Sequence, residues 1–435
     1  MKKTTLCCFA AVLFSVKALS QNSSNSSTLS PYSQYGFGVL ADQSQGFNRG
    51  MNGTGIGMRG GTLINTLNPA SYSAVDSLTM LFDAGLSAQL TNFKENGTSV
   101  NASSADVDYV AGLFRVMPRL GVSFGVLPFS DIGYSYTTAT YINNTVGSIA
   151  ESYSGSGGMH QAFVGVGWSP VKTLSIGANF AYLWGKYDRS IVSSSGSSNV
   201  TSINTLSKSY KASISNYTLT LGAQWQQSLG RKDNVTLGAT FGLGHKLGAD
   251  PTCEIVNINT STLVADTTTF TISNGLKLPS SYGVGLSWSH DERLTVAADY
   301  ALQKWGDTDY PEYDDNTKSY SLRSGLLCDR TRLSLGADYV HNSNSVRYLH
   351  RVHFRLGAAL ATPYYKVNGH DGPKETSLSI GLGLPLQNKW NNRSVLNVSA
   401  QWVRTAATDL ITDNTFRISV GLTFNERWFA KWRIE

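Results

Sequence analysis

Residues 416–425 read FRISVGLTFN and decide the fold, because they alternate strictly between two kinds of side chain. Phe, Ile, Val, Leu and Phe fall on one face of the strand that this pattern predicts, and Arg, Ser, Gly, Thr and Asn fall on the other. Aromatic and cationic residues follow at 427–433, as at a membrane interface, although six residues come after Phe429, unlike in barrels that end on the aromatic residue. The stretch is therefore predicted to be the closing strand of a transmembrane β-barrel.

The same alternation recurs along the chain, at 120–126, 174–184, 235–243, 282–288, 294–300 and 378–384. A soluble β-sandwich also alternates, so one such strand distinguishes little. Many strands with Leu, Val and aromatic residues on one face and Gly, Ser and Thr on the other indicate lipid outside and a polar lumen inside. After residue 20 no apolar stretch approaches the roughly 18–20 residues of a membrane helix, so a spanning chain of this kind must be a closed barrel.

Composition agrees with a barrel and excludes other classes. Charged residues make up 15% of the 435, against roughly 25% in soluble domains. The net charge of +6 falls to +3 when Lys2, Lys3 and Lys17 leave with a leader, so a concentrated basic surface for nucleic acid is not expected. The 9 Trp, 21 Tyr and 17 Phe exclude a disordered chain.

The spacing of the connections predicts fourteen strands. Short turns are expected near 117–118, 170–171, 228–232, 290–292, 343–352 and 386–392. Long polar connections are expected near 91–106, 145–157, 187–208, 247–268, 305–330 and 405–414, with 368–374 as a shorter outer loop. A fifteenth candidate strand, 319–329, is assigned to an outer loop or strand extension, because bacterial barrels have even strand numbers. The barrel is expected over 78–429, followed by a periplasmic tail, 430–435.

The N-terminus predicts export. Residues 1–20 combine two lysines, an apolar run and the ending Ala18-Leu19-Ser20, which is the pattern of a bacterial signal peptide. Cys7 and Cys8 leave with it. Cys253 and Cys328 remain and could pair in an oxidising compartment, but sequence does not show that they meet.

Two segments precede the first strand. Residues 21–34 are rich in Asn, Ser and Thr and are expected to form a flexible tether. Residues 35–77 are rich in Gly and lack alternation, yet they include Met51, Ile56 and Ile64, too apolar a set for a plain linker. This segment is predicted to fold inside the barrel as a plug.

The third predicted strand, 119–144, contains the sequence Leu127-Pro128-Phe129-Ser130. Proline donates no hydrogen bond to a strand ladder, so the sheet should bulge or break there. Two interpretations stay open: a structural bulge or alternative strand end, and a side opening into the bilayer.

Residues 49–58, RGMNGTGIGM, and Asn68-Pro69-Ala70 resemble the N-terminal hatch of the FadL family of outer-membrane channels for long-chain fatty acids and other hydrophobic compounds. Asn52 stands where many relatives carry Gly. The resemblance implies fourteen strands and a lumenal hatch, with hatch or gating roles for Gly53, Gly55, Gly57, Asn68, Pro69 and Ala70.

The resemblance extends over the mature chain. Residues 127–130 match the place where the family's third strand kinks inward to form a lateral opening. Leu278-Pro279 and the stretch from Asp299 to Trp305 also fit, and 421–429 resembles the branch found in Bacteroidetes.

No catalytic or cofactor site is expected. Residues 55–60 fit the dinucleotide pattern G-x-G-x-x-G, but no βαβ unit surrounds them. Ser123 lies in a G-x-S-x-G pattern inside an alternating strand, without the turn that exposes a hydrolase serine. The seven histidines show no metal-ligand spacing, and the acidic stretch 307–315 is interpreted as a solvated loop instead of a Ca²⁺ site.

Arg49 and Arg59 are the candidate contacts for a ligand carboxylate. The alternative, which we favour from sequence, is that they pair with acids of the plug or wall such as Asp76 and Asp83.

The first functional hypothesis is passive uptake of hydrophobic compounds such as fatty acids across the outer membrane of a Gram-negative bacterium, with lateral exit at Pro128. Such a ligand avoids the aqueous periplasm, since burying each CH₂ is worth about 0.8 kcal/mol. The alternative is a non-transport barrel that joins other outer-membrane proteins in an assembly or secretion machine, such as type IX secretion. A barrel lipase would need a Ser–His constellation that cannot be assembled from this sequence.

Overall fold

A computed structural model describes residues 30–77, 79–95, 97–142, 147–195, 205–259, 262, 264–386, 394–408 and 410–427. The predicted signal peptide, most of the tether and the predicted tail 430–435 lie outside these residues. Within the described ranges, no helix is both long enough and apolar enough to cross a membrane.

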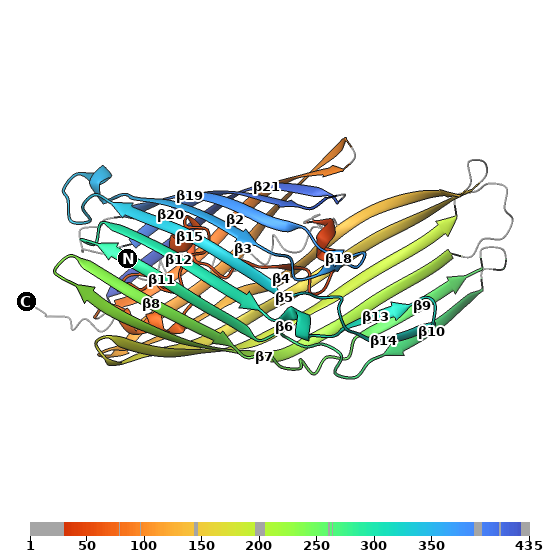
Figure 1. Ribbon diagram of the computed structural model, residues 1–435, viewed down its shortest axis with the longest axis horizontal. Coiled ribbons are helices and arrows are strands. Elements are labelled where there is room, and N and C mark those ends of the chain that lie inside the picture. The colour runs from red at the N-terminus through yellow and green to blue at the C-terminus, as the bar shows by residue number, and fades with distance from the viewer. Residues whose placement is uncertain are drawn as a thin grey trace, which may run out of the picture.

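Fourteen antiparallel strands close into a barrel (Figure 1). They are β2 (Thr79–Glu95), β3 (Thr98–Met117), β4 (Leu120–Ile142), β5 (Gly147–Val171), β6 (Leu174–Ser195), β7 (Thr205–Leu229), β8 (Asp233–Gly242), β11 (Ser281–His290), β12 (Leu294–Gln303), β15 (Arg330–Val340), β16 (His353–Ala361), β19 (Lys374–Leu386), β20 (Ser394–Ala406) and β21 (Thr412–Arg427). The first and last of them pair from Thr79↔Arg427 to Lys94↔Thr412, which closes the ring. The predicted fold class and strand number are confirmed.

The two faces of the wall carry the predicted side chains. Phe124, Ile176 and Leu378 are 38%, 43% and 51% exposed, whereas their neighbours Ser123 and Ser175 are fully buried. Since large apolar residues rarely cover a surface that faces water so continuously, the outer face is the lipid contact.

Strands β4 to β7 are 22–25 residues long, about twice the 9–11 residues that cross a bilayer. Beside β7, β9 (Thr252–Ile258) and β10 (Ala265–Thr271) extend this sheet beyond the rest of the rim. Figure 1 shows it projecting at the right; we call these six strand portions the outer extension.

Much of the predicted loop 91–106 is strand, in β2 and β3. The outer extension corrects the sequence analysis further, because much of the predicted loops 145–157, 187–208 and 247–268 is also strand. These segments are rich in Ser, Thr and Gly. Strands outside the bilayer need no apolar face, so they lack the alternation that marks the wall.

Two small hairpins and several 3₁₀ helices complete the connections. Residues 319–329 form no wall strand, as predicted: β14 (Ser319–Arg323) pairs with β13 (Tyr310–Asp314) in a separate hairpin. The other hairpin is β17 (Lys366–Val367) with β18 (His370–Asp371). The 3₁₀ helices are η4 (Trp305–Asp307) in the outer connection and η5 (Tyr348–Arg351) at the opposite end.

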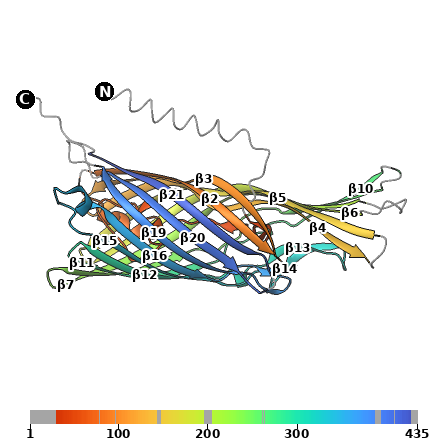
Figure 2. The same cartoon turned by 90° about the horizontal axis from the view of Figure 1, so that it is seen from above.

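The N-terminal segment crosses the inside of the ring (Figure 2). It contains η1 (Pro31–Gln34), β1 (Val39–Leu40), α2 (Gly46–Arg49) and η2 (Pro69–Ala74). Helix η2 packs against β4 to β7, whereas α2 packs against β2 and β19 to β21 on the other side. We call residues 30–77 the plug segment.

One part of the wall lacks strand pairing. Strand β4 pairs with β3 only as far as Val126↔Val110, and its register with β5 shifts between Pro128 and Ser130. Among the described residues, β3 residues 98–109 have backbone partners on β2 alone. We call this gap, between β3 residues 98–109 and β4 from residue 127 onward, the seam.

Candidate functional site

The glycine-rich turn of the plug segment is held by a wall carboxylate. The backbone N–H groups of Gly55 and Ile56 donate to Oδ2 of Asp299 on β12, at 2.6 and 2.9 Å. A Cβ on Gly57 would lie 2.9 Å from the backbone nitrogen of Ser287, so only glycine allows this close approach. Gly53 has a φ of 73°, which also favours glycine.

The sequence Asn68-Pro69-Ala70 anchors the other side of the plug segment. The Oδ1 of Asn68 accepts from the N–H of Ala70 at 3.1 Å and caps η2. Its Nδ2 donates to the carbonyl of Ile56 at 2.9 Å and to that of Ala223 on β7 at 3.2 Å. Pro69 packs where Gly177 leaves room, because a Cβ there would collide with the proline backbone.

Asn52 has a φ of 55°. Asparagine tolerates this left-handed conformation better than most residues. Its Nδ2 donates to the carbonyl and hydroxyl oxygens of Ser377, at 2.8 and 2.9 Å, and its Oδ1 accepts from Gln401 at 2.5 Å. The side chain of Asn52 therefore links the plug segment to the wall.

Arg49 is paired within the protein. Its Nη1 lies 3.1 Å from Oδ2 of Asp108 on β3, and both side chains are buried. The sequence analysis favoured such a pair but proposed Asp76 and Asp83; Asp83 instead accepts from the hydroxyl of Tyr109 at 3.0 Å.

Arg59 also bonds to protein groups. Its Nη1 donates to Oγ of Ser175 on β6 at 2.6 Å, and its Nη2 to Oγ of Ser73 at 3.3 Å. Burial lowers the pKa of this guanidinium. The structure does not bring Arg49 and Arg59 together as one anion site.

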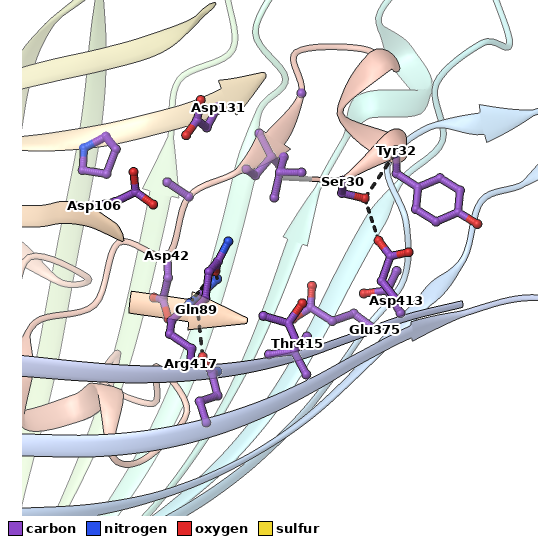
Figure 3. A pocket seen from close by; sticks show the side chains of 18 of the residues that line it. Ser30, Tyr32, Asp42, Gln89, Asp106, Asp131, Glu375, Asp413, Thr415 and Arg417 are labelled. Carbon is purple, nitrogen blue, oxygen red and sulfur yellow. Dashed lines mark hydrogen bonds between the residues drawn. The ribbon is translucent and has the colours of Figure 1, made fainter. Parts of the chain in front are cut away.

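The larger cavity, about 420 Å³, lies between the plug segment and the wall at the seam (Figure 3). Its lining combines apolar residues with charged groups of both signs, among them Asp42, Asp106, Asp131, Arg332, Glu375, Asp413 and Arg417. Although burial acts to raise the pKa of the Asp42 carboxyl, Arg332 and Arg49 hold it well below its usual value. An ionised lining of this kind suits water and polar groups better than a hydrocarbon.

The smaller cavity, about 310 Å³, lies next to the kink and is more apolar. Its lining includes Leu127, Phe129, Phe163, Leu243, Leu302 and Trp305. Of these two cavities, this one fits a hydrophobic molecule better.

The kink is braced by the plug segment. The carbonyl of Pro128 accepts from Nε2 of Gln43 at 2.7 Å, and that of Phe129 accepts from the N–H of Ala41 at 3.0 Å. Leu127 and Ser130 are buried. Strand β1 pairs with β4 directly beyond, at Ser130 and Asp131.

The sequence analysis missed two glycines that accommodate the kink. Gly157 and Gly158 on β5 lie opposite Ile132 and Asp131 and have φ values of 128° and 147°. The run SGSGG at 154–158 was the available signal, since adjacent glycines inside a strand mark a bulge or close approach.

The outer end of the lumen is filled by a buried cluster, which we call the aromatic cap. It comes mainly from η1, the outer connections and the tops of the wall strands, and includes Tyr32, Phe37, Tyr187, Ile214, Leu276, Trp305, Tyr364 and Tyr365. Trp305 is 1% exposed and lies 5.4 Å from Phe37 and 4.9 Å from Tyr364 between ring centroids. The sequence analysis missed this cap because its members are scattered over loops without periodicity.

The other residues that the sequence analysis considered for chemistry form no reactive site among the described residues. The hydroxyl of Ser123 donates to the carbonyl of Gly112 at 2.8 Å inside the wall. Cys253 and Cys328 are free thiols. The described ranges contain no group of three or more His, Cys, Asp or Glu residues arranged to hold a metal ion.

Several solved structures share this fold. The Ralstonia pickettii toluene transporter TbuX gives a TM-score of 0.61 at 14% identity, covering 89% of this chain and 99% of its own. A Pseudomonas aeruginosa FadL homologue gives 0.61 at 10% identity, covering 90% and 99%. The CymD monoaromatic hydrocarbon channel gives 0.56 at 14% identity, covering 91% and 100%.

Fold and plug segment thus define an outer-membrane barrel with the FadL/TodX architecture, from a Gram-negative bacterium. The chain belongs to the BamG family, whose model matches residues 1–435. No curated protein matches the sequence.

Proposed function

We propose that this protein is a non-transport barrel component of an outer-membrane protein assembly or secretion machine. The observation that carries the proposal is the obstructed lumen: the plug segment is bonded to opposite walls, and the aromatic cap, which includes its Tyr32 and Phe37, packs at the outer end. Moving a solute through would require breaking these buried contacts, each hydrogen bond being costly to leave unmade. The BamG family match supports the same interpretation.

The outer extension supports a role in binding protein. Six strands stand beyond the length needed to cross the bilayer, and their exposed residues are mostly Ser, Thr, Lys and Gly. A polar, hydrogen-bonded sheet of this size adds nothing to passage through the membrane, whereas it offers a rigid surface to a neighbour.

The test is affinity purification from native membranes in mild detergent. We expect one or more outer-membrane proteins to remain bound in fixed ratio to the barrel, and an unrelated barrel of similar size carried through the same steps to retain none of them. Purification of the barrel alone, with a hydrophobic molecule detected by native mass spectrometry, would reject the proposal.

The second candidate is passive uptake of hydrophobic compounds such as long-chain fatty acids. The smaller cavity beside the kink supports it, as do the structural neighbours, which include a monoaromatic hydrocarbon channel and a toluene transporter. In this case the hatch residues Gly53 to Ala70 would gate the lumen, and ligand would leave sideways at Leu127–Ser130. The resemblance of 421–429 further suggests the Bacteroidetes branch.

Uptake of a radiolabelled fatty acid by cells tests the second candidate. Replacing Leu127–Ser130 by an alternating, proline-free sequence should abolish uptake and leave a heat-modifiable barrel. Unchanged uptake would exclude exit at the kink.

A further inference from the structure

We propose that the seam is a docking site for an extended, basic segment of a partner outer-membrane protein, which adds as a strand to the free edge of β3. This inference rests on the proposed function and names the surface that carries it.

The first argument is the unpaired backbone. Among the described residues, twelve consecutive residues of β3, 98–109, have no strand partner on the side that faces β4. Natural sheet edges are commonly protected by charged residues, proline or bulges. In this stretch such features are confined to Asp106 and to Asp108, where the register shifts, whereas residues 98–105, TSVNASSA, contain no charge and no proline. An edge of this length accepts a segment of about 40 Å by backbone pairing.

The second argument is depth in the membrane. Val107 pairs with Leu86, and their outward side chains are 46% and 58% exposed. Ser103 pairs with Leu90, which is 63% exposed on the lipid face. Part of the free edge therefore lies level with hydrocarbon, where an unsatisfied backbone group costs several kcal/mol unless protein or water covers it.

The opposite side of the seam already shows strand addition. The plug segment's β1 pairs with β4 at Val39↔Asp131 and Leu40↔Ser130. The N–H of Ala41 continues the pairing to Phe129. An extended segment thus already pairs at the β4 side of the seam, whereas the β3 edge has no strand partner among the described residues.

The third argument is charge. Asp106, Asp108 and Asp131 line the cavity behind the seam. Arg49 neutralises Asp108, whereas no ion pair within the described ranges involves Asp106 or Asp131. Arg332 and Arg417 line the same cavity but donate to Asn52 and Gln89. The carboxylates of Asp106 and Asp131 therefore favour Lys or Arg side chains over the carboxylate of a fatty acid.

Site-specific photo-crosslinking in whole cells tests the proposal. p-Benzoylphenylalanine at Ala105 or Val107 should give a discrete protein adduct on irradiation. The same residue at Val296, which is 42% exposed on the lipid face of β12, is the matched control and should give none. Asp106→Lys, at an exposed position, should lower the adduct yield at Ala105 about tenfold through like-charge repulsion.

Two results would overturn the inference. Lipid adducts alone at Ala105 and Val107, while partner proteins still co-purify, would place the interface elsewhere and leave the proposed function standing. Absence of both adducts and co-purifying proteins would reject the two together.

Discussion

A few polar side chains, on the plug segment and on the wall facing it, hold the plug segment in a fixed position inside the barrel. Asp299 accepts two backbone N–H groups from the glycine turn, and Asn68 bonds both to the turn and to β7. Asn52 links the same segment to β19 and β20. Buried polar contacts of this kind stabilise a structure mainly because breaking one leaves the partner unsatisfied.

Asn52→Ala is expected to destabilise the barrel by about 1–3 kcal/mol, since it leaves Ser377 and Gln401 without their amide partner and alanine tolerates a positive φ less well than asparagine. The measurement is the temperature at which the folded band on an unheated gel disappears. Asn52→Gly separates the effects, because it loses the bonds and relieves the backbone. Equal melting of wild type and both variants would contradict the role assigned to Asn52.

The two thiols predict a pH-dependent reactivity. Burial raises the pKa of Cys253 and of Cys328 to about 11, and both lie outside the membrane-spanning strands. The thiolate is the reactive form, so at pH 8 only about one thiol in a thousand is ionised. Maleimide labelling of the native protein should be slow at pH 8, accelerate roughly tenfold per pH unit up to pH 10, and become fast on denaturation. Rapid labelling at pH 8 would contradict the burial.

At the scale of elements, the kink in β4 is a feature of two strands. The register shift at Pro128 is matched by Gly157 and Gly158 on β5, whose positive φ values let the neighbour follow the bend. The sequence predicted the break in β4, because proline cannot donate a hydrogen bond to the neighbouring strand. It did not predict the glycine side, since the barrel has glycines throughout its inward face and only the pairing shows which two face the kink.

Gly157→Ala should disturb the kink. An added Cβ would collide with the backbone of Lys186 and Tyr187 on β6, and alanine is strained at a φ of 128°. We expect a loss of at least about 2 kcal/mol of stability, measured as urea-induced unfolding in detergent. Gly230→Ala is the control, because Gly230 also has a positive φ, 73°, but an added Cβ there meets nothing within 4 Å, so the difference between the two variants reports the collision. A Gly157 variant as stable as that control would show that β5 bends without the glycine.

For the whole molecule, the sequence predicted the closed wall but not its occupied interior. The wall strands are predictable because apolar residues that face lipid alternate with small or polar residues that face the lumen along each of them. The aromatic cap, the outer extension and the seam depend on contacts between distant segments, such as Phe37 with Trp305, which no local pattern records. Residues 35–77 were predicted as a lumenal element, but their partners on the wall were not. Residues 31–34, predicted as part of a flexible tether, form the 3₁₀ helix η1 with Tyr32 and Ser33 buried.

Trp305→Ala tests whether the aromatic cap closes the outer end. Removing this buried indole should cost about 3–5 kcal/mol locally and leave a void in the cap. We expect larger and noisier single-barrel conductance in planar bilayers, with the folded band still present on gels. Trp225→Ala, 45% exposed on the lipid face, is the matched control. If Trp305→Ala and Trp225→Ala show the same conductance, the plug segment alone closes the lumen.

The pairing of β2 with β21 also constrains how the molecule is made. The plug segment precedes β2, yet wall glycines from β5 to β19 fit closely against it, and the ring closes only when the final strand joins the first. The earliest part of the chain to be secreted must therefore wait, unenclosed, until the last strand arrives. We therefore expect the barrel to fold around the N-terminal segment, with the pairing of β21 and β2 as the last step that encloses it.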